Sequence, residues 1–276
     1  MSTPRTARVQ IRRVSAERLL ADLPDHSVDV LVTDPPYQTV DRHSTSGHLR
    51  DWFPKSSSWP AIGRMLAIGR PTLKTDGVAF VMTNAAGLRE AITALERAGF
   101  RDVRPIAWDR QSPGLGLGLR HQIEFILVGR LPGSRTLRGT DLVSVAAVGP
   151  GTAGRYPTQK PEGLGRALAG MAGIGPGQTV VDPFCGSGAL LVGAVERGAT
   201  VIAGDLSARA IRQATARLVG RGPAGAGRVP AGSGRAPAGS GRAAGGSGRP
   251  APSRRTAPSP PRRAPRRRPR RPGGRP

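Results

Sequence analysis

The chain has 276 residues with 42 lysines and arginines against 18 aspartates and glutamates, which gives a net charge of +24. A single cysteine excludes an intrachain disulfide and a cysteine-based zinc site, and the four histidines show no metal-ligand spacing. The basic N-terminus lacks the apolar stretch of a secretory signal, and no apolar run approaches the ~18 residues that span a bilayer. We therefore expect a cytoplasmic protein without a metal and without a membrane segment.

The positive charge is concentrated at the C-terminal end of the chain. Residues 221–276 carry 15 arginines and no acidic residue, so they supply more than half of the net charge. This Gly-, Pro- and Arg-rich stretch cannot bury enough apolar surface to offset its conformational entropy, and we expect it to be a disordered basic tail after a domain over 1–220. Such a tail favours nucleic acid over a membrane as partner, although a low-complexity extension without a function is the alternative.

The first 220 residues alternate short apolar runs with amphipathic segments, which is typical of an α/β sheet with crossover helices. Strands are predicted at 28–33, 77–83, 101–108, 122–128, 178–182 and 200–204. Helices are predicted at 59–74, 86–99, 161–173, 187–197 and 207–219. The pattern weakens between 110 and 156, where we expect a loop or a small insert that recognises a target.

The first predicted strand, 28–33, ends in the string Asp34-Pro35-Pro36-Tyr37. The exocyclic amine of adenine or cytosine is a poor nucleophile, because its lone pair is delocalised into the ring. The Asp34 carboxylate and the Pro35 carbonyl can accept its two N–H groups and free that lone pair, while Pro36 stiffens the turn. Tyr37 can stack on a base that has left the duplex. A strand-end turn without chemistry is the alternative interpretation.

The strand predicted at 178–182 ends in a glycine-rich turn, Asp182-Pro183-Phe184-Cys185-Gly186-Ser187-Gly188. Ligands of open α/β sheets bind at such carboxyl ends, and glycine lets the backbone approach them closely. Neither the Gly-Lys-Ser/Thr of a phosphate-binding loop nor a third glycine at the dinucleotide spacing follows. The turn therefore indicates a nucleoside ligand without a pyrophosphate. We expect Cys185 to be a small buried residue.

Asp205 follows the strand predicted at 200–204, which is the next strand along the chain after the glycine turn. An acidic residue at this strand end commonly binds ribose hydroxyls. A helix N-cap is the alternative role for the same aspartate.

The two strings, with Tyr156-Pro157-Thr158-Gln159-Lys160-Pro161 between them, resemble the amino-group DNA methyltransferases that use S-adenosylmethionine. Because the Asp34 string precedes the glycine turn, the chain resembles the β arrangement of that family over about residues 10–220. The resemblance implies a circularly permuted, Rossmann-like methyltransferase sheet that is mostly parallel, with helices on both faces.

The resemblance also implies a set of site residues. The cofactor would be surrounded by Asp182, Phe184, Gly186 and Gly188, with Asp205 on its ribose. Thr158 and Lys160 would lie near its methionine end. Family members with Asp before the proline pair mostly methylate adenine at N6, so Asp34 to Tyr37 would act on a flipped adenine in DNA, with the tail on the phosphates.

Three other functions fit the same residues. Cytosine N4 and an amine in RNA share the pocket chemistry with adenine N6. A non-catalytic nucleic-acid-binding protein on a methyltransferase fold, with the basic tail as its working part, is the alternative from another class.

The stretch between 110 and 155 is short for a dedicated target-recognition domain.

Overall fold

The computed structural model describes residues 8–36, 58–114, 118–149 and 158–221. Within these ranges eight strands form one sheet in the order β1-β8-β7-β2-β3-β5-β4-β6. The strands are β1 (Val9–Arg13), β2 (Val28–Thr33), β3 (Leu73–Thr83), β4 (Arg101–Asp109), β5 (Ile123–Arg130), β6 (Leu142–Ser144), β7 (Thr179–Asp182) and β8 (Thr200–Asp205). Among them, β5 alone runs antiparallel to its neighbours, β3 and β4, so the mostly parallel sheet predicted from the sequence is confirmed.

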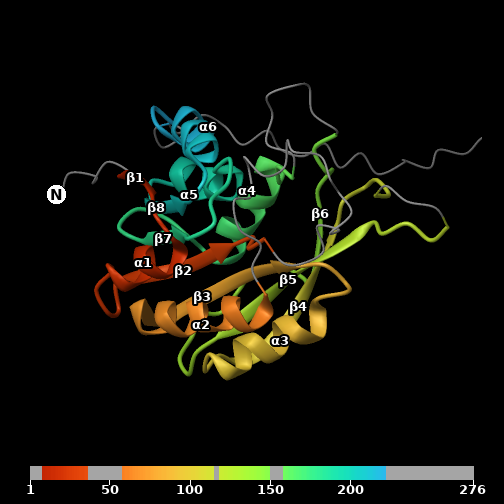
Figure 1. Ribbon diagram of the computed structural model, residues 1–276, viewed down its shortest axis with the longest axis horizontal. Helices are drawn as coiled ribbons and strands as arrows, with labels where there is room; N and C mark the ends of the chain where they lie inside the picture. Colours follow the sequence, from red (N-terminus) through yellow and green to blue (C-terminus); the bar gives the residue numbers. More distant parts are fainter. Residues whose placement is uncertain (1–7, 37–57, 115–117, 150–157, 222–276) are drawn as a thin grey trace, which may run out of the picture. The chain divides into compact units, whose positions relative to one another are not determined.

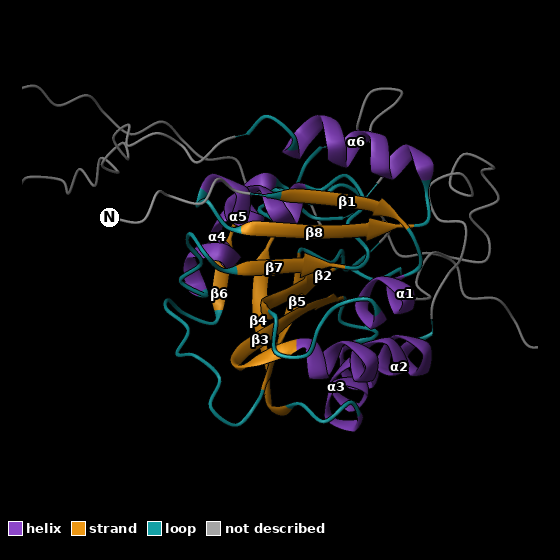
Figure 2. Ribbon diagram, turned by 90° about the vertical axis from the view of Figure 1, so that its left-hand side faces the viewer, coloured by secondary structure: helices purple, strands orange, loops and turns teal. Residues whose placement is uncertain are grey.

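Helices cover both faces of this sheet, as Figures 1 and 2 show. One face carries α1 (Ala16–Ala21), α2 (Trp59–Gly69) and α3 (Leu88–Arg97). The other face carries α4 (Glu162–Met171), α5 (Val192–Glu196) and α6 (Ala208–Leu218). Short 3-10 turns at Arg70–Thr72 and Ala189–Leu191 adjoin α2 and α5. The predicted helices on both faces are therefore confirmed.

A hydrophobic core lies on each side of the sheet. Strand β2 is buried at every position, as expected for a central strand between two helical layers. Val30 and Val32 pack in the core under α4, α5 and α6, whereas Leu31 packs in the core under α1, α2 and α3. Side chains of a strand alternate between faces, so one apolar run anchors both layers.

The helix predicted at 59–74 is shorter in the structure. It ends at Gly69 and passes through a 3-10 turn, and β3 already begins at Leu73. Pro71 has no backbone N–H to donate to the preceding turn, so the α-helical hydrogen-bond pattern ends here although Arg70 still has helical dihedrals.

The helix predicted at 187–197 also begins late. Gly186 and Gly188 have positive φ values of 50° and 77°, outside the right-handed helical region. The chain therefore makes a turn and a 3-10 segment before α5 begins at Val192.

Three elements of the structure were not predicted. Strands β1 and β6 are short and lie at the two edges of the sheet, and helix α1 has only six residues.

A buried carboxylate fixes the amino ends of three strands. The Asp29 side chain on β2 is 4% exposed and forms ion pairs with Lys74 and Arg135 at 2.8 and 2.9 Å. It also accepts the Thr179 N–H at 2.8 Å. Burial alone would raise the Asp29 pKa, but these hydrogen bonds outweigh burial and lower it. The cluster holds β2, β3 and β7 together at the edge of the sheet away from the two strings.

The order of the strands brings the two strings together. Strands β8, β7 and β2 are neighbours and parallel, so their carboxyl ends share one edge of the sheet. Asp34 follows β2, Asp182 ends β7 and Asp205 ends β8.

Residues 222–276 lie outside the described residues, so the boundary near 220 and the basic tail stay predictions.

Candidate active site

Asp34 lies directly after β2, at the edge of the sheet where the carboxyl ends of β8, β7 and β2 meet. Its Oδ2 atom accepts a hydrogen bond from the Nζ of Lys160 at 2.6 Å, and the two side chains are 18% and 11% exposed. Pro35 is buried and Pro36 is partly buried, while Tyr37 lies outside the described residues. The structure therefore joins a residue of the first string to the proline-containing segment that precedes α4.

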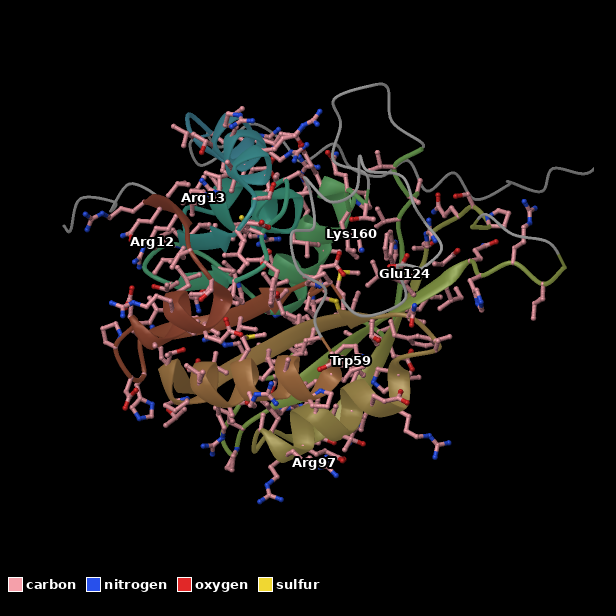
Figure 3. All side chains as sticks on the ribbon, in the orientation of Figure 1. Arg12, Arg13, Trp59, Arg97, Glu124 and Lys160 are labelled. Carbon is pink, nitrogen blue, oxygen red and sulfur yellow. The ribbon has the colours of Figure 1, made fainter. Side chains whose placement is uncertain are left out.

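Two further charged residues continue from Lys160. Its Nζ is 3.6 Å from Oε2 of Glu124 on β5, and Glu124 Oε1 is 3.3 Å from a guanidinium nitrogen of Arg110. Figure 3 shows Lys160 and Glu124 side by side, one from the segment before α4 and the other from β5. Neither Glu124 nor Arg110 was predicted. The available signal was a glutamate inside the apolar run 123–128.

The glycine turn is held in shape by its own backbone and by the end of β8. The Gly188 N–H donates to the Cys185 carbonyl at 2.7 Å, and the Cys185 N–H donates to the Gly204 carbonyl at 2.9 Å. A Cβ on Gly188 would lie 3.0 Å from Leu218 Cδ1 on α6. Cys185 is buried as predicted, and burial raises the pKa of its thiol.

Asp182 shapes this turn from inside the protein. It is 1% exposed, and its Oδ1 atom accepts the Phe184 N–H at 3.0 Å. Burial raises the pKa of Asp182 well above its ordinary value, and the negative charge of Asp34 raises it further. Phe184 is only partly buried and packs against the core under α1, α2 and α3.

Asp205 supports the same turn from the neighbouring strand. Its two carboxylate oxygens accept the Gly186 N–H at 3.0 Å and the Ser207 N–H at 2.8 Å. Burial raises the pKa of Asp205. The N-cap of α6 is Ser207, whose Oγ accepts the Ala210 N–H, so Asp205 is not the cap residue itself. The carboxylate lies beside the turn that the sequence assigned to the cofactor.

Arg217 on α6 connects this turn to the segment that holds Lys160. Its guanidinium donates hydrogen bonds to the Ser187 carbonyl, to Gln159 Oε1 at 3.0 Å and to Glu162 Oε1 at 3.1 Å. Thr158, at the start of that segment, is exposed. Sequence reasoning missed Arg217, because α6 carries several arginines and only the tertiary structure shows which one faces inward.

Two kinds of feature are absent from the described residues. They contain no group of three or more His, Cys, Asp or Glu side chains arranged to hold a metal ion. None of their helices combines the length and the apolar character required to cross a membrane.

Known proteins share both the sequence pattern and the fold. Residues 155–222 match a family model described as an RMKL-like methyltransferase domain. The chain is 23% identical over 231 residues to the type II methyltransferase M2.DpnII of Streptococcus pneumoniae, a match that covers 73% of this chain and 86% of the relative.

Two solved structures have the same fold. The M1.HpyAVI-SAM complex superposes with a TM-score of 0.57 at 19% identity and covers 76% of this chain and 100% of that one. The PvuII DNA methyltransferase, described as cytosine-N4-specific, gives a TM-score of 0.60 at 16% identity and covers 79% and 89%. Together these matches support an S-adenosylmethionine-dependent amino-group DNA methyltransferase family for this chain.

The two strings lie at the ends of adjacent strands of the sheet. Pairing of Val30 with Val180 and Leu31 with Val181 sets β2 against β7, so Asp34 emerges beside the glycine turn. The edge therefore presents a carboxylate acceptor next to a turn that carries a partly buried aromatic residue. Such an arrangement can hold an amine against a bound nucleoside.

Proposed function

We propose that this methyltransferase transfers a methyl group from S-adenosylmethionine to N6 of adenine in DNA. The observation that carries the proposal is the position of Asp34, directly after β2 and beside the glycine turn of β7. This position provides a hydrogen-bond acceptor for an amine next to a turn suited to a nucleoside.

The residues present fit S-adenosylmethionine by their chemistry. The segment that carries Thr158 and Lys160 would lie near the methionine end of the cofactor, and Asp205 offers acceptors for the ribose hydroxyls. Phe184, which is only partly buried, would stack on the adenine of the cofactor, and Gly186 allows the backbone to approach it. When bound, the cofactor supplies a methyl group activated by a sulfonium.

The chain's own residues act on the substrate amine. Asp34 and the Pro35 carbonyl accept its N–H groups, which directs the nitrogen lone pair toward the methyl group. Tyr37 stacks on the flipped base and holds it in line. With the methyl group transferred and a neutral thioether as the leaving group, the methylated nitrogen would give one proton to the Asp34 carboxylate, which passes it to water. The protein thus contributes positioning and a polar environment.

DNA is the proposed substrate because the relatives are named as type II and DNA methyltransferases. Adenine is favoured by the aspartate at position 34, since family members with Asp before the proline pair mostly methylate adenine at N6. Cytosine N4 is the second candidate, favoured by the cytosine-N4-specific neighbour with the same fold. The arginines of 222–276 would add contacts to phosphates without reading the sequence.

Methylation of unmodified nucleic acid tests the proposal. The purified protein is incubated with isotope-labelled S-adenosylmethionine and plasmid DNA from a host without methyltransferases, and in parallel with total RNA. Digestion to nucleosides and mass spectrometry then identify the labelled product. Labelled N6-methyladenine in the DNA is the expected result.

Every other product would revise the proposal. Labelled N4-methylcytosine would replace adenine by the second candidate, and label in RNA alone would overturn the DNA assignment. Saturable cofactor binding without label in any nucleoside would favour a non-catalytic nucleic-acid-binding protein.

A further inference from the structure

Lys160 occupies the acceptor that the reaction needs. Its ammonium lies 2.6 Å from Oδ2 of Asp34, the carboxylate proposed to accept the target amine. A carboxylate that is paired with an ammonium is a weaker acceptor for a neutral N–H donor, because part of its charge is already neutralised. The nearby positive charge also opposes the positive charge that develops on the attacking nitrogen.

A second carboxylate lies near the same ammonium. Glu124 Oε2 is 3.6 Å from the Lys160 nitrogen, which is within ion-pair range but beyond a normal hydrogen bond. This oxygen is buried and has no hydrogen-bond partner among the described residues. Buried charged atoms normally have partners, so an unfilled acceptor at this distance marks a second position for the ammonium.

The position of Glu124 is fixed by its surroundings. It lies directly opposite Trp108 in the β4–β5 pairing, and the other oxygen, Oε1, is 3.3 Å from Arg110. Arg110 lies over the Trp108 ring at 6.0 Å, and the Trp108 indole donates to the Val145 carbonyl at 2.8 Å. Because Oε1 is held from this side, Oε2 is the atom left to face Lys160.

We propose that Glu124 is a positioning residue that takes Lys160 away from Asp34 when the target amine enters. A movement of about 1 Å changes the partner of the ammonium and leaves Asp34 as the acceptor for the amine. The Lys160 ammonium is paired with a carboxylate in both positions, so its own charge is compensated in each state. The inference rests on the proposed function and deepens it, since it assigns Glu124 to the same site.

A double-mutant cycle tests this inference. Single-turnover methyl transfer to DNA is measured at saturating S-adenosylmethionine for the wild type, Glu124→Gln, Lys160→Met and the double variant. We expect Glu124→Gln to slow transfer roughly 100-fold, because Lys160 then stays on Asp34. In the Lys160→Met background the same change should have no further effect, since there is no ammonium to remove.

Controls separate this role from a structural one. Glu17→Gln, which removes an exposed carboxylate on α1, should transfer at the wild-type rate. Thermal unfolding and cofactor affinity of Glu124→Gln should match those of the wild type. Should that variant fail to fold, Glu124→Asp keeps the charge but withdraws it by one methylene, and its transfer should be slowed to a smaller extent.

Two results would overturn the inference. One is a methyl-transfer rate of Glu124→Gln within twofold of the wild-type rate. The other is a double variant whose rate loss equals the product of the losses in Glu124→Gln and Lys160→Met, because Glu124 would then act independently of Lys160. Both require an active wild type. An inactive wild type would refute the proposed function instead, so the two failures are distinguishable.

Discussion

The ammonium nitrogen of Lys160 lies 2.6 Å from the Oδ2 atom of Asp34, although 126 positions separate the two residues. The contact arises because β2 and β7 are neighbours in the sheet and α4 packs against the face above them. It connects the string that the amine is expected to meet with the segment assigned to the cofactor. The two predicted parts of the site therefore share one charged pair.

Replacement of Arg217 by alanine should weaken cofactor binding about tenfold, because its hydrogen bonds to Ser187 and Gln159 fix the glycine turn and the Lys160 segment. Arg217→Lys should be intermediate, since lysine keeps the charge but cannot form the same fork of donors. Calorimetric titration with S-adenosylmethionine measures the effect. Arg212→Ala, an exposed position on the same helix, is the matched control. Equal affinities for Arg217→Ala and the control would refute this role.

Gly188→Ala should destabilise the glycine turn. The residue has a φ of 77°, which costs a residue with a Cβ about 1–2 kcal/mol. The new Cβ would also lie 3.0 Å from Leu218 Cδ1 and 3.2 Å from the Ala214 Cα. We expect a lower free energy of unfolding by about 2 kcal/mol or more, together with weaker cofactor binding.

The matched control is Gly175→Ala, where an added Cβ meets nothing within 4 Å and φ is not positive. Denaturant unfolding should leave this control within about 1 kcal/mol of the wild type. A Gly188→Ala protein as stable as the control would show that the turn tolerates a side chain.

The buried carboxyl of Asp182 should make stability depend on pH. Its pKa in the folded protein is raised above 3.8 by burial, so the fold favours the protonated form. The stabilisation is complete below the unfolded pKa and is lost as the pH rises through the folded pKa. Asp182→Asn stays neutral and keeps an oxygen for the Phe184 N–H. The stability of this variant relative to the wild type should therefore increase with pH.

Urea unfolding of both proteins between about pH 4 and pH 8 measures this difference, which can grow by up to about 1.4 kcal/mol per pH unit. A difference that stays constant, or that shrinks as the pH rises, would contradict the raised pKa.

Removal of residues 222–276 should weaken DNA binding and flatten its salt dependence. The segment carries 14 arginines, each able to neutralise a phosphate and release a counterion. Arg221 is kept in the truncated protein, because it forms ion pairs with Glu162 and Glu196 at 3.1 and 3.4 Å. DNA titrations at several salt concentrations give the slope. Turnover at saturating DNA should be unchanged, and complete loss of activity would contradict a role limited to binding.

The sequence was most informative where short-range signals agree. Strand β2 has the predicted bounds, Val28–Thr33, because a mostly apolar run, interrupted by Asp29, ends at a proline turn. The neighbourhood of Asp34 and Asp182 also followed, since carboxyl ends of parallel strands meet at one edge. Helix α2 was predicted too long, because its amphipathic pattern continues past Pro71 while the backbone cannot.

Contacts between distant segments could not be predicted. Lys160 was assigned to the methionine end of the cofactor, and its ion pair with Asp34 depends on how α4 approaches the sheet. Glu124 lies on β5, which runs antiparallel to β3, and the sequence does not reveal this pairing. Such pairs depend on topology rather than on local pattern, so no spacing in the chain reveals them.

The central claim is that Asp34 accepts the target amine beside a bound methyl donor. The most direct measurement is the single-turnover rate of labelled methyl transfer to unmethylated DNA by Asp34→Asn, with cofactor affinity measured on the same preparation. The account predicts a rate reduced by about 10²–10³-fold or more with cofactor affinity nearly unchanged. Methyl transfer by Asp34→Asn at the wild-type rate would contradict it.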